Sequence, residues 1–126
     1  MATEKPKRRF FSRLSESDER RLADELRTWA DGISGSVRIE AAPPRTRVKL
    51  AGVVRRITIR PVHGFAALEV VLYDGTGEAS VLWLGRRMIP GLTLGSRLVV
   101  EGTLGVERGI ARVVNPTFEF LPPPEA

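Results

Sequence analysis

Residues 46–120 consist of short apolar runs separated by glycine-containing turns, and no other feature of the sequence constrains the fold as strongly. This pattern predicts five strands at residues 46–60, 66–73, 78–84, 96–104 and 110–120, with hairpin turns at 74–77 and 105–109. Five short strands are too few to fill two packed sheets, but they can close into one small barrel, which protects the sheet edges. We therefore expect a mainly β fold built around a closed barrel.

The first strand is long, and its apolar phase changes along its length. Val48 and Leu50 share one face, whereas Ile57 and Ile59 have the opposite parity. A phase change inside a strand indicates a β-bulge, and we expect this bulge at Gly52. The bend lets one strand join two parts of a curled sheet. A bent first strand, a hairpin, a connection and a second hairpin follow one another in this order in the five-stranded OB-fold Greek-key barrel.

Two later segments are predicted to be irregular. Residues 85–95 contain several glycines and can form at most one helical turn before Pro90. The last strand contains Asn115 and Pro116, so we expect it to be interrupted there and to end as an edge or a bulge.

One N-terminal amphipathic helix is predicted over residues 14–33. Ser15 is suited to cap its start, and Gly32 is suited to end it. Apolar side chains recur at helical spacing and form a narrow stripe, made of Leu22, Leu26, Trp29 and Ile33. This stripe either packs on the chain's own barrel or binds a protein partner or a second copy of the chain.

Three further segments flank the helix and the barrel. Residues 1–13 hold five basic residues and one acid, and we expect them to form a disordered basic arm that either aids solubility or adds affinity for an anionic partner. Residues 34–45 are predicted to be a linker, stiffened by two prolines, with a short lead-in strand at 37–39. Residues 121–126 read as a proline-rich tail.

Composition narrows the function classes. The 126-residue chain has a formal net charge of +5, with seventeen arginines and three lysines, and a small basic domain makes nucleic acid the first partner to consider. Cysteine is absent and His63 is the one histidine, so we expect no metal site and no cofactor. The residues match no catalytic motif, which predicts a protein that is not an enzyme. No long apolar run and no secretory signal are present, so we expect a cytoplasmic protein that does not enter a membrane.

OB-folds bind single strands through a basic groove that follows the phosphates and through aromatic side chains that stack on bases. The candidate binding residues lie at strand ends and in loops where this fold holds its ligand: Arg55, Arg56, Arg60, Tyr73, Arg86, Arg87 and Arg108. We expect these positions to converge on one face. The alternative is that the arginines are scattered over a solvated surface.

The remaining aromatic residues have two interpretations each. Trp83 is expected either in the core or toward a ligand; if Ser80 and the other even positions of its strand face outward, Trp83 is buried with Val81. Phe65 either stacks on a base or plugs the barrel. Phe118 and Phe120 are expected either in the core or beneath the N-terminal helix.

Five segments in the barrel region resemble the OB-fold nucleic-acid-binding family. They are residues 48–54, 72–77, 83–86, 95–102 and 114–119. The sequence is similar to the wedge domain of RecG-type branch-migrating DNA helicases and to small stand-alone actinobacterial OB-fold proteins. The resemblance implies single-stranded or branched nucleic acid as the ligand, with DNA favoured over RNA. It carries no ATP-driven activity, because a helicase motor is absent, and the usual connecting helix is reduced to residues 85–95. The alternative function is an OB module that binds a protein within a DNA repair, replication or other assembly.

Overall fold

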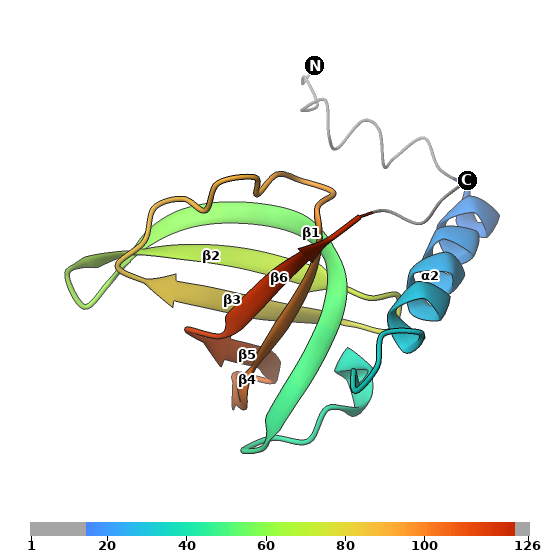
Figure 1. Ribbon diagram of the computed structural model, residues 1–126, viewed down its shortest axis with the longest axis horizontal. Coiled ribbons are helices and arrows are strands. Elements are labelled where there is room, and N and C mark those ends of the chain that lie inside the picture. Colours follow the sequence, from blue (N-terminus) through green and yellow to red (C-terminus); the bar gives the residue numbers. More distant parts are fainter. Residues whose placement is uncertain (1–14, 123–126) are drawn as a thin grey trace.

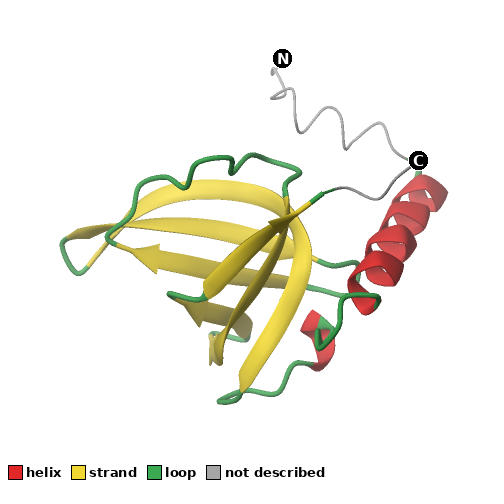
Figure 2. Ribbon diagram, viewed as in Figure 1, coloured by secondary structure: helices red, strands yellow, loops and turns green. Residues whose placement is uncertain are grey.

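The computed structural model describes residues 15–122, so the predicted basic arm and most of the predicted tail lie outside the described residues. Its elements are α2 (Glu16–Asp31), the 3-10 helix η1 (Ile39–Ala41), β1 (Arg47–Val62), β2 (Phe65–Tyr73), β3 (Glu78–Leu84), β4 (Arg97–Glu107), β5 (Ile110–Val114) and β6 (Thr117–Leu121). Strands make up about half of the described residues, and Figure 2 shows α2 and the short turn η1 beside them. In the described part of the chain, no helix is long and apolar enough to cross a membrane.

The strands close into a ring. β1 pairs with β2 through its second half and with β4 through its first half, and the order β1-β2-β3-β5-β4 returns to β1. β3 and β5 run parallel, and the other neighbours are antiparallel. Figure 1 shows how strongly β1 curves to serve both halves. This is the five-stranded OB-fold barrel, preceded by one helix, that the sequence predicts.

The bulge that bends β1 lies at Arg55, so the prediction that placed it at Gly52 is wrong. Gly52 stays in register opposite Leu98, whereas the pairing with β2 slips between Val54 and Arg56. Gly52 has a different reason to be glycine. A Cβ atom there would lie 2.8 Å from the carbonyl oxygen of Tyr73, closer than a side chain tolerates. The phase change between Val48 and Ile57 therefore indicated a real bulge, but the close approach of two strands decided where glycine is needed.

Alternating side chains of all five barrel strands fill the core, as expected for strands with one inward face. Fully buried residues include Leu50, Leu68, Leu72, Leu98 and Leu104.

Trp83 belongs to this core. Only 4% of the residue is exposed, and its Nε1 donates a hydrogen bond to the Pro116 carbonyl oxygen at 3.2 Å. The ring of Phe118 packs edge-on against it at a centroid distance of 5.3 Å, and Phe120 packs edge-on against Phe118. Trp83 therefore does not face a ligand, and Phe118 packs against the core. Phe120 is 36% exposed and belongs neither to the core nor to the cluster under the helix, so the expectation for this residue is wrong.

Residues 85–95 contain no helix, in agreement with the prediction of an irregular connection. Ile89 enters the core from this segment and is 5% exposed. Leu92 packs against the same cluster. Two apolar side chains of an irregular connection therefore contribute to the core.

The two long hairpins end in two-residue turns. Both central residues have positive φ, at His63 and Gly64 between β1 and β2 and at Arg108 and Gly109 between β4 and β5. Such turns match the twist of the strands they join. The second turn is shorter than the predicted 105–109, because Gly105 remains paired in β4.

The last predicted strand is interrupted as expected. Asn115 has a positive φ of 54°, and its side-chain oxygen accepts a hydrogen bond from the Leu84 amide at 2.9 Å. The break separates β5, which pairs with β3 and β4, from β6, which pairs with the first half of β4.

The helix stripe packs on the chain's own barrel. Ser15 caps α2 by accepting a hydrogen bond from the Asp18 amide at 3.1 Å. Leu26 and Ala30 are buried, and Ala30 forms a small cluster with Ala51 and Val99 of the barrel. Of the two open interpretations of the stripe, the structure therefore supports docking within the chain.

Trp29 and Gly75 fix the position of the same helix. The guanidinium of Arg97 lies 4.7 Å from the centroid of the Trp29 ring. Burial lowers the pKa of Arg97, and the nearby negative charge of Glu25 opposes this shift. A Cβ atom on Gly75 would collide with the backbone of Ala23, so the β2–β3 turn lies against α2.

The linker is more ordered than the sequence indicates, and the lead-in strand predicted at 37–39 is wrong. Ile39 begins η1 and is buried in the core. Its amide donates to Asp74 Oδ2 at 2.9 Å, while Asp74 Oδ1 accepts from the amides of Thr76 and Gly77. Asp74 is 1% exposed, and its carboxylate holds the 3-10 turn against the β2–β3 turn, because both oxygens are used.

Candidate nucleic-acid interface

The outer face of β1, β2 and β3 is set by strand register. In β2, Leu68, Val70 and Leu72 point into the barrel, so the alternating positions face outward. Directly paired residues share a face, and the pairs Arg60–Ala67 and Arg56–Val71 place both arginines on the outer face.

The same rule extends this face across the next two strands. Ser80 of β3 lies beside Val71 of β2, and Arg112 of β5 lies beside Ser80. The floor between the arginines is made of short side chains, with Ala67 0%, Ser80 6% and Val71 9% exposed. We call this surface the arginine face and define it by Arg56, Arg60, Ala67, Glu69, Val71, Ser80, Leu82 and Arg112.

Carboxylates on or beside the arginine face are each paired with one arginine. Arg60 Nε lies 3.3 Å from Glu69 Oε1, and Arg55 Nη1 lies 2.7 Å from Glu78 Oε2. Arg112 pairs with Glu107.

Four predicted site residues keep an uncompensated charge. Within residues 15–122, no ion pair involves Arg56, Arg86, Arg87 or Arg108, and all four are exposed. The barrel therefore presents free positive charge on and around the arginine face.

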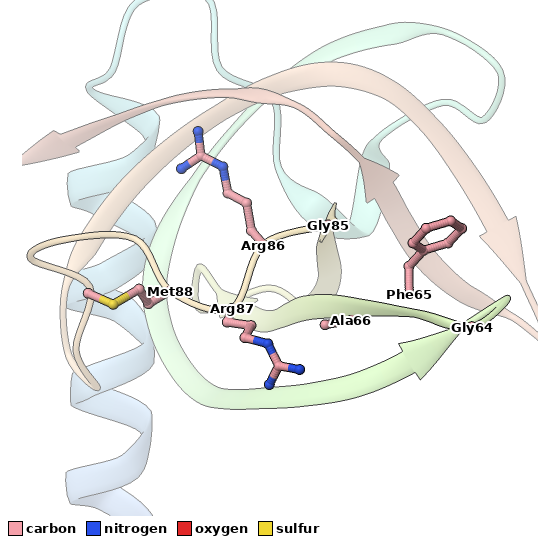
Figure 3. A pocket seen from close by; sticks show the side chains of 7 residues that line it. All are labelled: Gly64, Phe65, Ala66, Gly85, Arg86, Arg87 and Met88. Atoms are coloured by element: carbon pink, nitrogen blue, oxygen red, sulfur yellow. The ribbon is translucent and has the colours of Figure 1, made fainter.

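Arg86 and Arg87 line an open hollow where the chain leaves β3. Figure 3 shows this hollow, which is also lined by Gly64, Phe65, Ala66, Gly85 and Met88. The two guanidinium groups point to opposite sides of the segment, so they spread positive charge over both sides of the β3 exit. Phe65 is 69% exposed and Met88 is 68% exposed. Phe65 is therefore no plug.

The two hairpin turns lie at opposite ends of β3. Leu84, at the end of β3, pairs with Ala67 near the β1–β2 turn, whereas Ala79, near its start, pairs with Ala111 beside the β4–β5 turn. Arg108 occupies that second turn. Figure 1 shows the β1–β2 hairpin projecting away from the side of the barrel that α2 covers. The helix therefore does not cover the β1–β2 turn.

The structure thus brings some predicted site residues together and separates others. Arg55, Arg56, Arg60 and Tyr73 lie together on the outer side of β1 and β2. Arg86 and Arg87 lie at one end of β3 and Arg108 at the other. Tyr73 is half-buried, and the Arg55 guanidinium lies 3.8 Å from its ring centroid.

Two residues of this face were missed or misjudged from the sequence. Arg112 was not among the candidates, although it alternates with the apolar Ala111 and Val113 and such a position faces outward. Ser80 was expected to be exposed; it is buried because its Oγ donates to Glu69 Oε2 at 2.6 Å between neighbouring strands. That hydrogen bond could not be read from the sequence, because it depends on strand register.

The residues that the structure describes include no group of three or more histidine, cysteine, aspartate or glutamate side chains placed to hold a metal ion. Comparisons with known proteins add little. No family model matches the sequence, and no curated protein matches it. Among solved structures, the chain is similar to a chain of a replication protein A heterotrimer bound to ssDNA, with a TM-score of 0.49 and 18% sequence identity. The similarity covers 61% of this chain and 58% of that chain.

Proposed function

We propose that this chain binds single-stranded or branched nucleic acid through the arginine face together with the arginines at its two ends, Arg86, Arg87 and Arg108, without catalysing a reaction. One observation carries the proposal: Arg56, Arg86, Arg87 and Arg108 are exposed and have no carboxylate partner among the described residues, on or beside a floor of short side chains. Guanidinium groups suit phosphate oxygens in shape and charge.

The arrangement supplies the two elements that a single-strand site needs. Arg86 and Arg87 at one end of β3, Arg108 at the other end and Arg56 on β1 provide positive charge for phosphates. Tyr73 and the exposed Phe65 offer rings on which bases can stack. The preference for DNA over RNA rests on the sequence resemblance alone.

A second candidate is a protein-binding OB module. The observation that favours it is the pair of exposed apolar side chains, Phe65 and Met88, in the hollow beside Arg86 and Arg87. A partner protein with apolar and acidic side chains would fit that hollow.

Fluorescence anisotropy separates the two candidates. Labelled 30-nucleotide DNA single strands, a fork, the matching duplex and an RNA strand are titrated with the protein at several salt concentrations. We expect the single strand or the fork to bind more tightly than the duplex, and binding to weaken as salt rises. Absence of binding even at low salt contradicts the nucleic-acid proposal and favours a protein partner.

A further inference from the structure

A single carboxylate lies in the middle of the arginine face. Glu69 is central in β2, and its side chain is 19% exposed. Its register partners are Thr58 of β1 and Leu82 of β3, so it lies on the floor and not at an edge. A negative charge at this place opposes phosphate binding.

Two neighbours fix the orientation of this carboxylate. Ser80 Oγ donates to Glu69 Oε2 at 2.6 Å, and Arg60 Nε lies 3.3 Å from Glu69 Oε1. An ionised carboxylate has about four lone-pair positions, so these two contacts leave acceptor capacity on both oxygens. Glu69 is therefore a pre-oriented acceptor that can take further hydrogen-bond donors.

A nucleic acid meets this floor with its bases if its phosphates follow the arginines. Bases differ in what they offer to a carboxylate. Cytosine presents an N4 amino donor where thymine presents the O4 carbonyl acceptor, and carboxylate side chains accept hydrogen bonds from cytosine N4. The two pyrimidines have the same ring size, so they differ little in stacking area.

We propose that Glu69 determines base preference on the arginine face, favouring cytosine over thymine. This inference rests on the proposed function, because it needs a single strand on that face. Ser80 and Arg60 act as positioning residues, since they hold the carboxylate and its acceptor positions in place.

The test compares fluorescein-labelled dC15 and dT15 at pH 7.5 and one salt concentration, using the full chain. We expect the wild-type protein to bind dC15 at least about fivefold more tightly than dT15. Glu69→Gln removes the charge, retains the shape, and adds an amide N–H group that can donate a hydrogen bond to thymine O4. It should bring the ratio of the two affinities to within about twofold, mainly by tightening the binding of dT15.

Glu119→Gln is the matched control, because Glu119 is an exposed glutamate on β6, outside the arginine face. It removes the same charge and should leave the dC15-to-dT15 ratio unchanged. Ser80→Ala keeps the Glu69 charge but removes its anchor, and we expect an intermediate ratio. Thermal melting of each variant shows whether it is folded. If Glu69→Gln does not fold, the dC15-to-dT15 ratio of Ser80→Ala tests the inference in its place.

Three results would overturn the inference. Equal affinity of the wild-type protein for dC15 and dT15 removes the base preference. A Glu69→Gln variant that tightens both oligonucleotides by the same factor shows that the carboxylate acts only as a charge. Failure of both oligonucleotides to bind, at any salt, overturns the proposed function together with this inference; binding without preference overturns the inference alone.

Discussion

The guanidinium of Arg55 lies 3.8 Å from the centroid of the Tyr73 ring, and the same group is bonded to the Glu78 carboxylate at 2.7 Å. The β-bulge lies at this residue: Arg55 is the extra residue of β1 between Val54 and Arg56, where the pairing with β2 slips. The ring of Tyr73 is consequently held in place on the outer side of the sheet, with its cation contact already formed before any ligand binds.

Replacing Tyr73 tests whether this ring stacks on a base. Tyr73→Ala should lower the affinity for single-stranded DNA by about 1–3 kcal/mol, the range for a lost base stack, and leave the salt dependence nearly unchanged. Tyr73→Phe keeps the ring and should bind almost as well as the wild type. Anisotropy titrations of both variants provide the comparison. Equal losses in the two variants would show that the hydroxyl, and not the ring, matters.

Gly52 tests the packing of the barrel. Gly52→Ala places a Cβ atom 2.8 Å from the Tyr73 carbonyl oxygen, and we expect it to lower the free energy of unfolding by about 1–3 kcal/mol. Gly105→Ala is the control, because the nearest atom to its Cβ would be the Arg112 carbonyl oxygen at 3.7 Å, an ordinary contact. Urea denaturation of both variants measures the difference. If Gly52→Ala is as stable as Gly105→Ala, the close approach of β1 and β2 is not as described.

Asp74 tests the attachment of η1. Asp74→Ala removes the acceptor of the buried Ile39 amide and of the Thr76 and Gly77 amides, so unfolding should become easier by about 2–4 kcal/mol. Hydrogen exchange at the Ile39 amide should accelerate as well. Thr76→Val removes one hydroxyl donor to the same carboxylate and should cost less. Unchanged protection of the Ile39 amide in Asp74→Ala would contradict the role given to this carboxylate.

Trp83 separates stability from binding. Trp83→Phe loses the hydrogen bond to the Pro116 carbonyl oxygen, which we expect to lower the free energy of unfolding by about 1–3 kcal/mol. Affinity for a single strand should not change at a temperature where the variant is folded, because only 4% of the residue is exposed. A loss of affinity without a loss of stability would place Trp83 in the ligand site.

The barrel could be predicted from the sequence because strand alternation and turn residues are local signals. The bulge position could not, because Arg55 and Gly52 are distinguished only by their pairing with β2 and β4. The η1 turn was missed for a similar reason: the side chain that stabilises it, Asp74, lies 35 residues away in the sequence.

The candidate site was predicted in part. Arginine positions at strand ends followed from the expected topology, and the structure places Arg55, Arg56 and Arg60 on one face with Tyr73. Glu69 was not among the candidate residues, because the hydrogen bond from Ser80 depends on the register of β2 and β3.

The salt dependence of single-strand binding tests most directly whether the arginine face and the arginines at its ends bind phosphate. The slope of log affinity against log salt concentration is measured for the wild type, for Arg86→Ala/Arg87→Ala, and for Arg20→Ala/Arg21→Ala, a matched pair of adjacent exposed arginines on α2. Each phosphate contact to a single strand contributes about 0.7 to this slope. We predict that the Arg86/Arg87 variant flattens the slope by about 0.7 to 1.4, for one or two lost contacts, and that the Arg20/Arg21 variant leaves it at the wild-type value. Equal flattening in both variants, or a wild-type affinity that does not respond to salt, would contradict binding through the arginine face and the arginines at its ends.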